Sequence, residues 1–177
     1  MYAAHFAAAL AVKARVPRAP LAALLAAAFL PDFLWIAFAR AGFEPEYPPR
    51  GFFDDWSHSV LMMTVWATLF ALLFLRRGRA VALAVWIAGL SHLALDFLIH
   101  PARLSLYPHA SLHAGWNLWA WGQARSHLGP SHYWWVEAAC VAALLALYAG
   151  SARRADIAPR VASAACLLVA GLHLLSV

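Results

Sequence analysis

The chain has 177 residues, of which 64% are hydrophobic and only 12% are charged. A soluble domain of this length is nearer half apolar and roughly a quarter charged, so one small water-soluble core cannot bury the excess. We therefore expect an all-α, polytopic membrane bundle forming a single domain over residues 1–177. The net charge of +5 does not indicate nucleic acid, because the basic residues form short clusters between apolar segments.

Apolar segments that predict membrane helices follow one another along the chain. They cover residues 2–12, 20–39, 57–75, 80–100, 132–149 and 161–176. The first is too short to cross about 30 Å of hydrocarbon at about 1.5 Å per residue, so a tilted, extended or half-spanning helix stays open. We expect about five to six membrane helices, joined by a polar loop at 40–56 and a Trp-rich segment at 101–131. Cys140 and Cys166 lie in apolar runs, which indicates reduced packing residues.

The basic clusters predict an orientation. Residues 13–18, 76–79 and 153–160 each contain three Lys or Arg side chains. Alternating membrane helices would place these three loops on one side, which the positive-inside rule makes cytoplasmic. The expected location is a bacterial inner membrane, with the N-terminus and the 40–56 and 101–131 segments on the periplasmic side.

Segment 91–101 carries the strongest functional signal. It places His92, Asp96 and His100 four residues apart in an apolar run. Steps of four on a helix advance the face by only about 40°, so the three side chains point roughly one way. Two imidazoles and a carboxylate on one stripe favour a metal site over a packing surface.

Other ionisable residues fall at the same predicted depth, near the outer membrane face. Membrane-buried acids and histidines are costly and usually functional. The predicted metal ligands are therefore His5, Asp32, His58, His92, Asp96 and His100, and the predicted catalytic residues are Asp96, Glu137 and His100. The alternatives are a structural His–Asp hydrogen bond for residues 92 and 96, helix-start chemistry for His58, and pairing of Glu137 with Arg103 or Arg125. A contribution from His109, His113, His127 or His132 stays open.

The order of these motifs resembles a known family. Leu30-Pro31-Asp32, Ser57-His58-Ser59 and the His92-to-Pro101 motif, with His5 before them, are similar to the bacterial membrane-bound metal-dependent hydrolases (YdjM-like inner-membrane proteins). More distantly, they resemble zinc-dependent phospholipase C and the single-strand-specific zinc nucleases. The chain departs from these patterns at Leu34, where the family commonly has a second Asp, and it lacks the later His-x-x-x-Glu of the phospholipases.

These patterns together predict a metal-dependent hydrolase. The N and O donors suit Zn, with Mn or Fe(II) also compatible and one to three ions expected. The expected reaction is cleavage of a phosphoester in a lipid or lipid-linked substrate by a metal-activated water. The alternative is a metal-binding transporter or sensor, but residues 61–75, 81–88 and 139–148 offer almost no polar path to the inner face. The sequence leaves the substrate and the oligomeric state open.

Overall fold

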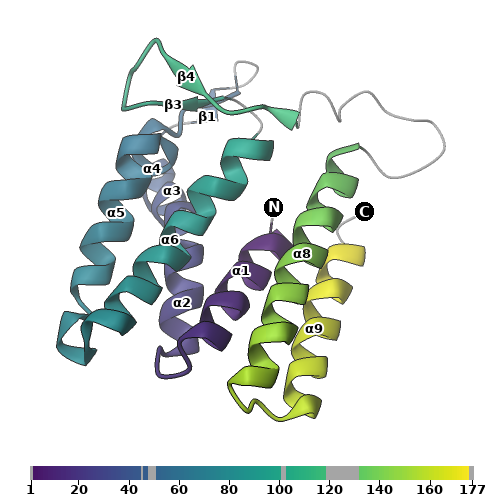
Figure 1. The fold of residues 1–177 in the computed structure, drawn as a ribbon. Helices are drawn as coiled ribbons and strands as arrows, with labels where there is room; N and C mark the ends of the chain where they lie inside the picture. The colour runs from purple at the N-terminus through teal and green to yellow at the C-terminus, as the bar shows by residue number, and fades with distance from the viewer. Residues whose placement is uncertain (1, 45, 48–50, 101–102, 119–131, 176–177) are drawn as a thin grey trace.

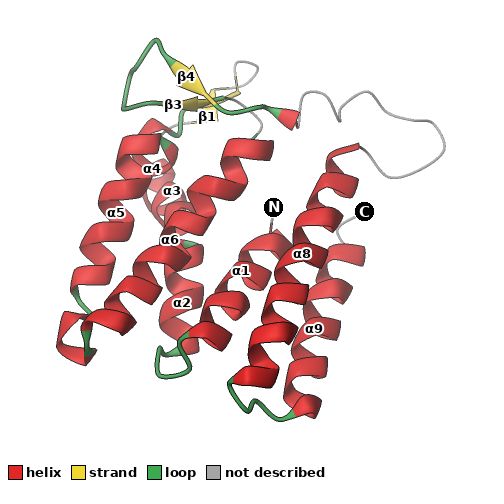
Figure 2. Ribbon diagram, in the orientation of Figure 1, coloured by secondary structure: helices red, strands yellow, loops and turns green. Residues whose placement is uncertain are grey.

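The computed structural model describes residues 2–44, 46–47, 51–100, 103–118 and 132–175. Within them the chain is almost entirely helical, with two short pairs of strands at one end (Figures 1 and 2). The predicted all-α class is confirmed. Each of the six predicted segments forms helix, although their limits differ. The helices are α1 (Tyr2–Arg15), α2 (Leu21–Ala28), α3 (Leu30–Arg40), α4 (Asp55–His58), α5 (Val60–Leu72), α6 (Arg79–Ile99), α8 (His132–Arg154) and α9 (Pro159–Leu174).

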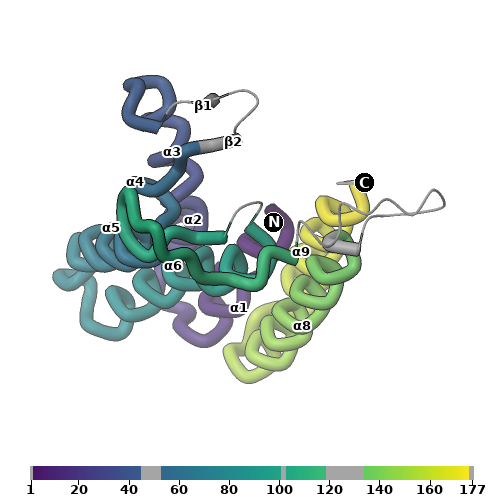
Figure 3. The backbone as a smooth tube through the Cα atoms, turned by 90° about the horizontal axis from the view of Figure 1, so that it is seen from above, coloured from purple at the N-terminus to yellow at the C-terminus, as the bar shows by residue number. Residues whose placement is uncertain are grey.

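Helix α1 lies at the centre of the bundle. It packs against α2 and α6 on one side and against α8 and α9 on the other (Figure 3). Its buried residues are mostly alanines, whose small side chains let neighbouring backbones approach closely. The helix is 14 residues long, which corresponds to about 21 Å, so it is extended beyond residue 12, one of the options left open by the sequence, but remains shorter than a membrane span.

The predicted 20–39 segment is broken into two helices. Helices α2 and α3 meet at Phe29 with a bend of 55°. Pro31 follows at the start of α3, and its missing N–H leaves the carbonyl four residues earlier without its helical donor. Asp32 lies in the first turn of α3, directly after this bend, and its carboxylate is 3.6 Å from His58 Nε2.

Two of the described helices are long and apolar enough to cross a membrane, namely α6 and the Trp134–Arg154 part of α8. A third span results if the bent α2–α3 pair is counted as one. Helices α5 and α9 are apolar but shorter, with 13 and 16 residues. Large apolar side chains are nevertheless exposed on both long helices and on both short ones, among them Leu61, Leu83, Leu147 and Leu167. Outward-facing leucines of this kind are compatible with a lipid environment.

The loops that carry the three basic clusters lie together. The connections α1–α2, α5–α6 and α8–α9 are all at the lower end of the bundle in Figure 1. The α5–α6 connection contains a short 3₁₀ turn, η1 (Leu75–Arg77). The strands lie at the opposite end. The helix order therefore gathers the basic loops at one end, as the sequence predicts.

Two short hairpins occupy segments that the sequence suggests are plain loops. Strand β1 (Glu46–Tyr47) pairs with β2 (Gly51–Phe52), and β3 (Leu104–Ser105) pairs with β4 (His113–Ala114), both antiparallel. The second hairpin is joined to the helices by two backbone hydrogen bonds, from Leu61 N–H to the Leu106 carbonyl and from Trp116 N–H to the Phe97 carbonyl. Gly115 has φ 109° and a Cβ there would lie 2.9 Å from the Phe97 oxygen, so only glycine fits this approach. The hairpin is thereby fixed over the carboxyl end of α6.

Candidate metal centre

All six predicted metal ligands come together in the structure. They belong to α1, α3, α4 and α6, and to the residue that follows α6. Three overlapping groups bring one ligand atom of each member within 4.8 Å of the others. The groups are His5 with His92 and Asp96, Asp32 with His58 and His92, and His58 with Asp96 and His100. We call these six residues the His–Asp cluster.

Helix α6 supplies the centre of the cluster. His92 and Asp96 are both buried on one face of it, one turn apart, as the spacing of four predicts. His100 differs from the prediction, because α6 ends at Ile99 and His100 has an extended backbone with ψ 138°. The next residue in the sequence is a proline, which disfavours helix in the residue before it. His100 still reaches the cluster, but from the helix end.

Asp96 faces three histidines from three different helices. Its carboxylate lies 3.2 Å from His92 Nε2, 3.7 Å from His5 Nε2 and 4.0 Å from His58 Nε2. His58 Nε2 lies 3.6 Å from Asp32 Oδ1 as well. Two ligands that bind one tetrahedral ion at about 2.1 Å are about 3.4 Å apart. The observed separations bracket this value, whereas most of them are too long for direct hydrogen bonds.

Two buried imidazole nitrogens in the cluster have no partner other than the cluster itself. Among the described residues, His5 Nδ1 makes no hydrogen bond, and His92 Nε2 has only its 3.2 Å contact with Asp96 Oδ2. The other nitrogen of His92, Nδ1, lies 2.7 Å from the Ala28 carbonyl, which can only accept, so Nδ1 carries the proton. Nε2 of His92 faces Asp96 Oδ2 at 3.2 Å, and in the neutral ring this nitrogen is the one that can offer a lone pair to a metal ion. A buried donor set of imidazoles and carboxylates with lone pairs left over fits a transition-metal ion.

The cluster is closed on one side and open on the other. The side chains of His5 and His92 are only 2% and 1% exposed, whereas the Asp32 side chain is 31% exposed. His100 lies on the open side too, where its Nε2 is 3.1 Å from Asp54 Oδ2. Asp54 belongs to the polar loop at 40–56 and is not among the predicted site residues. The structure instead places it as the partner of His100.

Sequence reasoning missed Glu44. It belongs to a loop rich in proline and acidic residues, which is typical of a solvated segment, yet its side chain is fully buried. Burial raises the pKa of the Glu44 carboxyl, and hydrogen bonds from Ser57 and Trp56 oppose that shift. Ser57 in turn lies next to His58 of the cluster. The only sequence signal was an acid placed before Ser57-His58, which by itself does not predict burial.

Asp55, the first residue of α4, connects that helix to the second hairpin. Its carboxylate accepts hydrogen bonds from the Ser105 hydroxyl at 2.6 Å and from the His109 N–H at 2.7 Å. It therefore joins α4 to the β3–β4 hairpin. The N-cap of α5 is Ser59, whose hydroxyl accepts from the Met62 N–H at 3.3 Å.

Glu137 is not brought into the His–Asp cluster. Its buried carboxylate accepts a hydrogen bond from the Ala3 N–H at 3.2 Å, and its second oxygen lies 3.7 Å from His173 Nδ1. This contact satisfies the start of α1, which lies inside the bundle. The sequence-based pairings were with Arg103, which makes no ion pair within the described part of the chain, and with Arg125, which is outside it.

His109 and His113, the described histidines of the 101–131 segment, do not belong to the His–Asp cluster. The His109 ring stacks on Phe53 with centroids 4.9 Å apart, and His113 Nδ1 lies 3.0 Å from the Ser111 carbonyl. Neither belongs to a metal-compatible group of the described residues. His127 lies outside the described residues, and His132 is described only as the first residue of α8.

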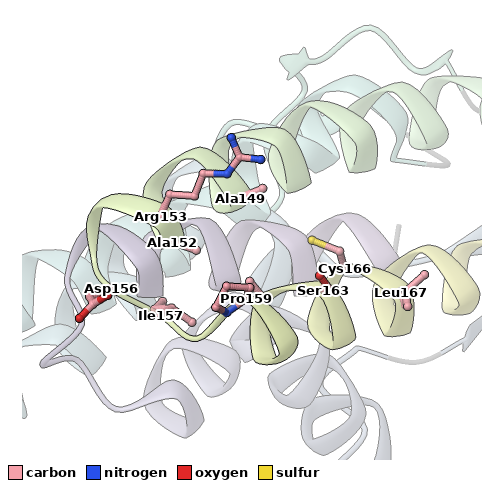
Figure 4. Close-up of a pocket in the computed structure, with 10 residues that line it drawn as sticks. Ala149, Ala152, Arg153, Asp156, Ile157, Pro159, Ser163, Cys166 and Leu167 are labelled. Atoms are coloured by element: carbon pink, nitrogen blue, oxygen red, sulfur yellow. The ribbon is translucent and has the colours of Figure 1, made fainter.

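A cavity elsewhere in the molecule is separate from the cluster. It has a volume of about 580 Å³ and lies between the end of α8 and the start of α9 (Figure 4). Its lining includes Arg153, Asp156 and Cys166 and none of the six cluster residues.

Comparison of the chain with models of known protein families, with curated proteins and with solved structures found no match.

Proposed function

We propose that this chain is a membrane-embedded, metal-dependent hydrolase that cleaves a phosphoester of a lipid or lipid-linked molecule at the outer face of the membrane. The observation that carries the proposal is the convergence of six side chains from four helices and the end of α6 around one small volume, namely His5, Asp32, His58, His92, Asp96 and His100. Such a set in an apolar bundle is costly to maintain without a cation. The order of these residues also resembles that of the metal-dependent hydrolases named above.

Each part of the site has a separate task in this proposal. His5, His58 and His92 would hold the metal through neutral ring nitrogens, and Asp96, which lies between them, would add a carboxylate ligand. Asp32 completes the set at the open side. When bound, the metal supplies Lewis-acid stabilisation of charge on the phosphoryl group and lowers the pKa of a coordinated water.

His100 and Asp54 take the proton-handling role in this proposal. His100 Nε2 lies 3.1 Å from Asp54 and is oriented by it on the open side of the site. An imidazole in this position can hold a proton and pass it to the leaving oxygen. Glu137 was predicted to be catalytic, but its contact with Ala3 gives no support to that role.

The membrane arrangement is part of the same proposal. Five or six of the helices cross or enter a bacterial inner membrane, with the basic loops in the cytoplasm and the hairpin end outside. The position of the basic loops at the end opposite the hairpins supports this orientation. A site that opens near the outer interface suits a substrate delivered from the lipid layer.

The decisive experiment is elemental analysis of protein purified without chelators, followed by a hydrolysis screen with phospholipids and phosphomonoesters. We expect a bound transition metal and metal-dependent release of a phosphorylated or phosphate product. Absence of a transition metal would overturn the proposal. Bound metal without hydrolysis, together with metal flux in proteoliposomes, would establish the transporter alternative.

A further inference from the structure

Glu44 is tied to the start of α4 by three short contacts. Its Oε1 accepts hydrogen bonds from the Trp56 N–H at 2.6 Å and from the Ser57 N–H at 2.7 Å. Its Oε2 lies 2.7 Å from the Ser57 hydroxyl. Glu44 and Ser57 are both fully buried. The carboxylate is thus held in a fixed position beside the residue that precedes His58.

Ser57 connects this carboxylate to His58. The Ser57 hydroxyl oxygen lies 2.8 Å from His58 Nδ1. A hydroxyl has one proton, and an ionised carboxylate can only accept hydrogen bonds. When Ser57 donates to Glu44, its oxygen faces His58 as an acceptor, and Nδ1 of His58 must carry a proton to use it.

The consequence falls on the other nitrogen of His58. With the proton on Nδ1, Nε2 keeps its lone pair, and this is the nitrogen that lies 3.6 Å from Asp32 and 4.0 Å from Asp96. Metal-binding histidines are commonly oriented through a hydrogen bond from their second nitrogen to a carboxylate, carbonyl or water. His92 has the same arrangement with the Ala28 carbonyl.

We propose that Glu44 and Ser57 are positioning residues that set the tautomer and ring orientation of His58 for metal binding. This inference rests on the proposed metal-binding role of the His–Asp cluster. A purely structural reading would give Glu44 only the task of anchoring the loop to α4. The two readings differ in what an amide at position 44 does.

Glu44→Gln separates them. The amide oxygen can still accept from the N–H groups of Trp56 and Ser57, so the anchor is retained. The amide nitrogen then faces Ser57 as a donor, so the Ser57 proton must turn to another acceptor. His58 Nδ1 at 2.8 Å is nearer than the Asp54 carbonyl at 3.1 Å, and we expect the proton to turn toward Nδ1. His58 is driven to the tautomer with the proton on Nε2, and that nitrogen no longer presents its lone pair to a metal.

The test uses the full-length protein in detergent. Nitrogen-labelled histidine NMR of the metal-free protein reports the His58 tautomer, assigned by comparison with His58→Gln. Competition titration with a chelating dye then measures Zn affinity. We expect the Nδ1–H form in the wild type, a shift to Nε2–H in Glu44→Gln, and about 10–100-fold weaker Zn binding in Glu44→Gln and Ser57→Ala.

Two matched controls guard against general loss of folding. Ser59→Ala removes a neighbouring buried hydroxyl whose hydrogen bond is with the Met62 N–H at the start of α5. Asp156→Asn makes an isosteric change in the α8–α9 turn. Both should keep the wild-type Zn affinity and the wild-type His58 tautomer.

The failure of this inference is distinct from failure of the proposed function. Unchanged tautomer and affinity in Glu44→Gln, with a wild type that binds Zn, would overturn the positioning role alone. An Nε2–H tautomer of His58 in the wild type would do the same. Absence of Zn binding by the wild type would instead overturn the metal site on which the inference rests.

Discussion

His5 and His92 stack face to face, with ring centroids 4.1 Å apart and an angle of 2° between the ring planes. One ring comes from α1 and the other from α6, and the Nε2 atoms of both approach Asp96, at 3.7 and 3.2 Å. Two protonated imidazoles at this separation would repel each other, and one carboxylate compensates one charge. Neutral rings that share a divalent cation avoid this repulsion. The stacked pair therefore supports the proposed metal site.

Removal of the charge of Asp96 should abolish metal binding. Asp96 is shared by two of the metal-compatible groups and lies beside three histidines, so Asp96→Asn leaves the shape but weakens every group that uses it. We expect the metal content measured by elemental analysis to fall to background. Asp156→Asn is the matched control and should keep the wild-type content. Wild-type metal content in Asp96→Asn would contradict the ligand assignment.

Metal binding should stabilise the fold. A ligand that binds only the folded protein adds about 2.7 kcal/mol at a free concentration 100 times its Kd. For a chain of this size that corresponds to about 5–10 °C in Tm. We expect Zn to raise the Tm of chelator-treated protein by this amount in a thermal shift assay. The same titration on Asp96→Asn should give no shift, and an equal shift there would assign the stabilisation to another site.

Gly89 should be essential for the contact between α5 and α6. A Cβ at this position would lie 2.8 Å from the Cβ of Ala67 and 3.3 Å from its Cα. Gly89→Ala therefore forces the two helices apart, at a cost of about 1–3 kcal/mol in unfolding free energy. Because Gly89 lies one turn before His92, we expect weaker Zn binding as well.

Gly150→Ala is the control for this substitution. Nothing lies within 4 Å of the Cβ it would add, and alanine favours helix over glycine by about 1 kcal/mol. It should leave the Tm unchanged or raise it. Equal Tm values for the two variants would show that the α5–α6 contact adapts to a methyl group.

Glu137 should matter for stability and not for metal binding. Glu137→Ala leaves the buried Ala3 N–H without its acceptor, which costs about 1–3 kcal/mol. Glu137→Gln keeps an acceptor oxygen and should be milder. Both variants should keep the wild-type metal content when measured by elemental analysis. Loss of metal in Glu137→Gln would place Glu137 among the ligands.

The proposed orientation can be tested by cysteine labelling. With Cys140 and Cys166 replaced by alanine, single cysteines are introduced by Ser111→Cys near the β3–β4 hairpin and by Asp156→Cys in the α8–α9 turn. A membrane-impermeant thiol reagent should label the first variant in intact cells and the second only after permeabilisation. The reverse pattern would invert the orientation, and labelling of both in intact cells would contradict a membrane-embedded bundle.

Local pattern was sufficient for the helical segments and for one face of the site. Apolar runs, separated by basic clusters or by the 40–56 and 101–131 segments, predicted the six helical segments, and the spacing of His92 and Asp96 placed both on one face of α6. These features depend on helical periodicity and on the hydrophobicity of short segments, and both are properties of residues that are neighbours in the sequence. The break at Phe29 and the end of α6 do have local signals, Pro31 and Pro101, but hydrophobic periodicity does not report them, and the burial of Glu44 has no such signal.

Tertiary packing decided which of these pieces meet. His5 reaches His92 because the alanines of α1 let it lie at the centre of the bundle, and Asp32 reaches His58 through the bend between α2 and α3. Packing also took Glu137 to the start of α1 and brought Glu44 next to Ser57. A sequence pattern fixes the face on which a side chain lies. The partner of that face is set by the shapes of helices far apart in the chain, and no local periodicity encodes it.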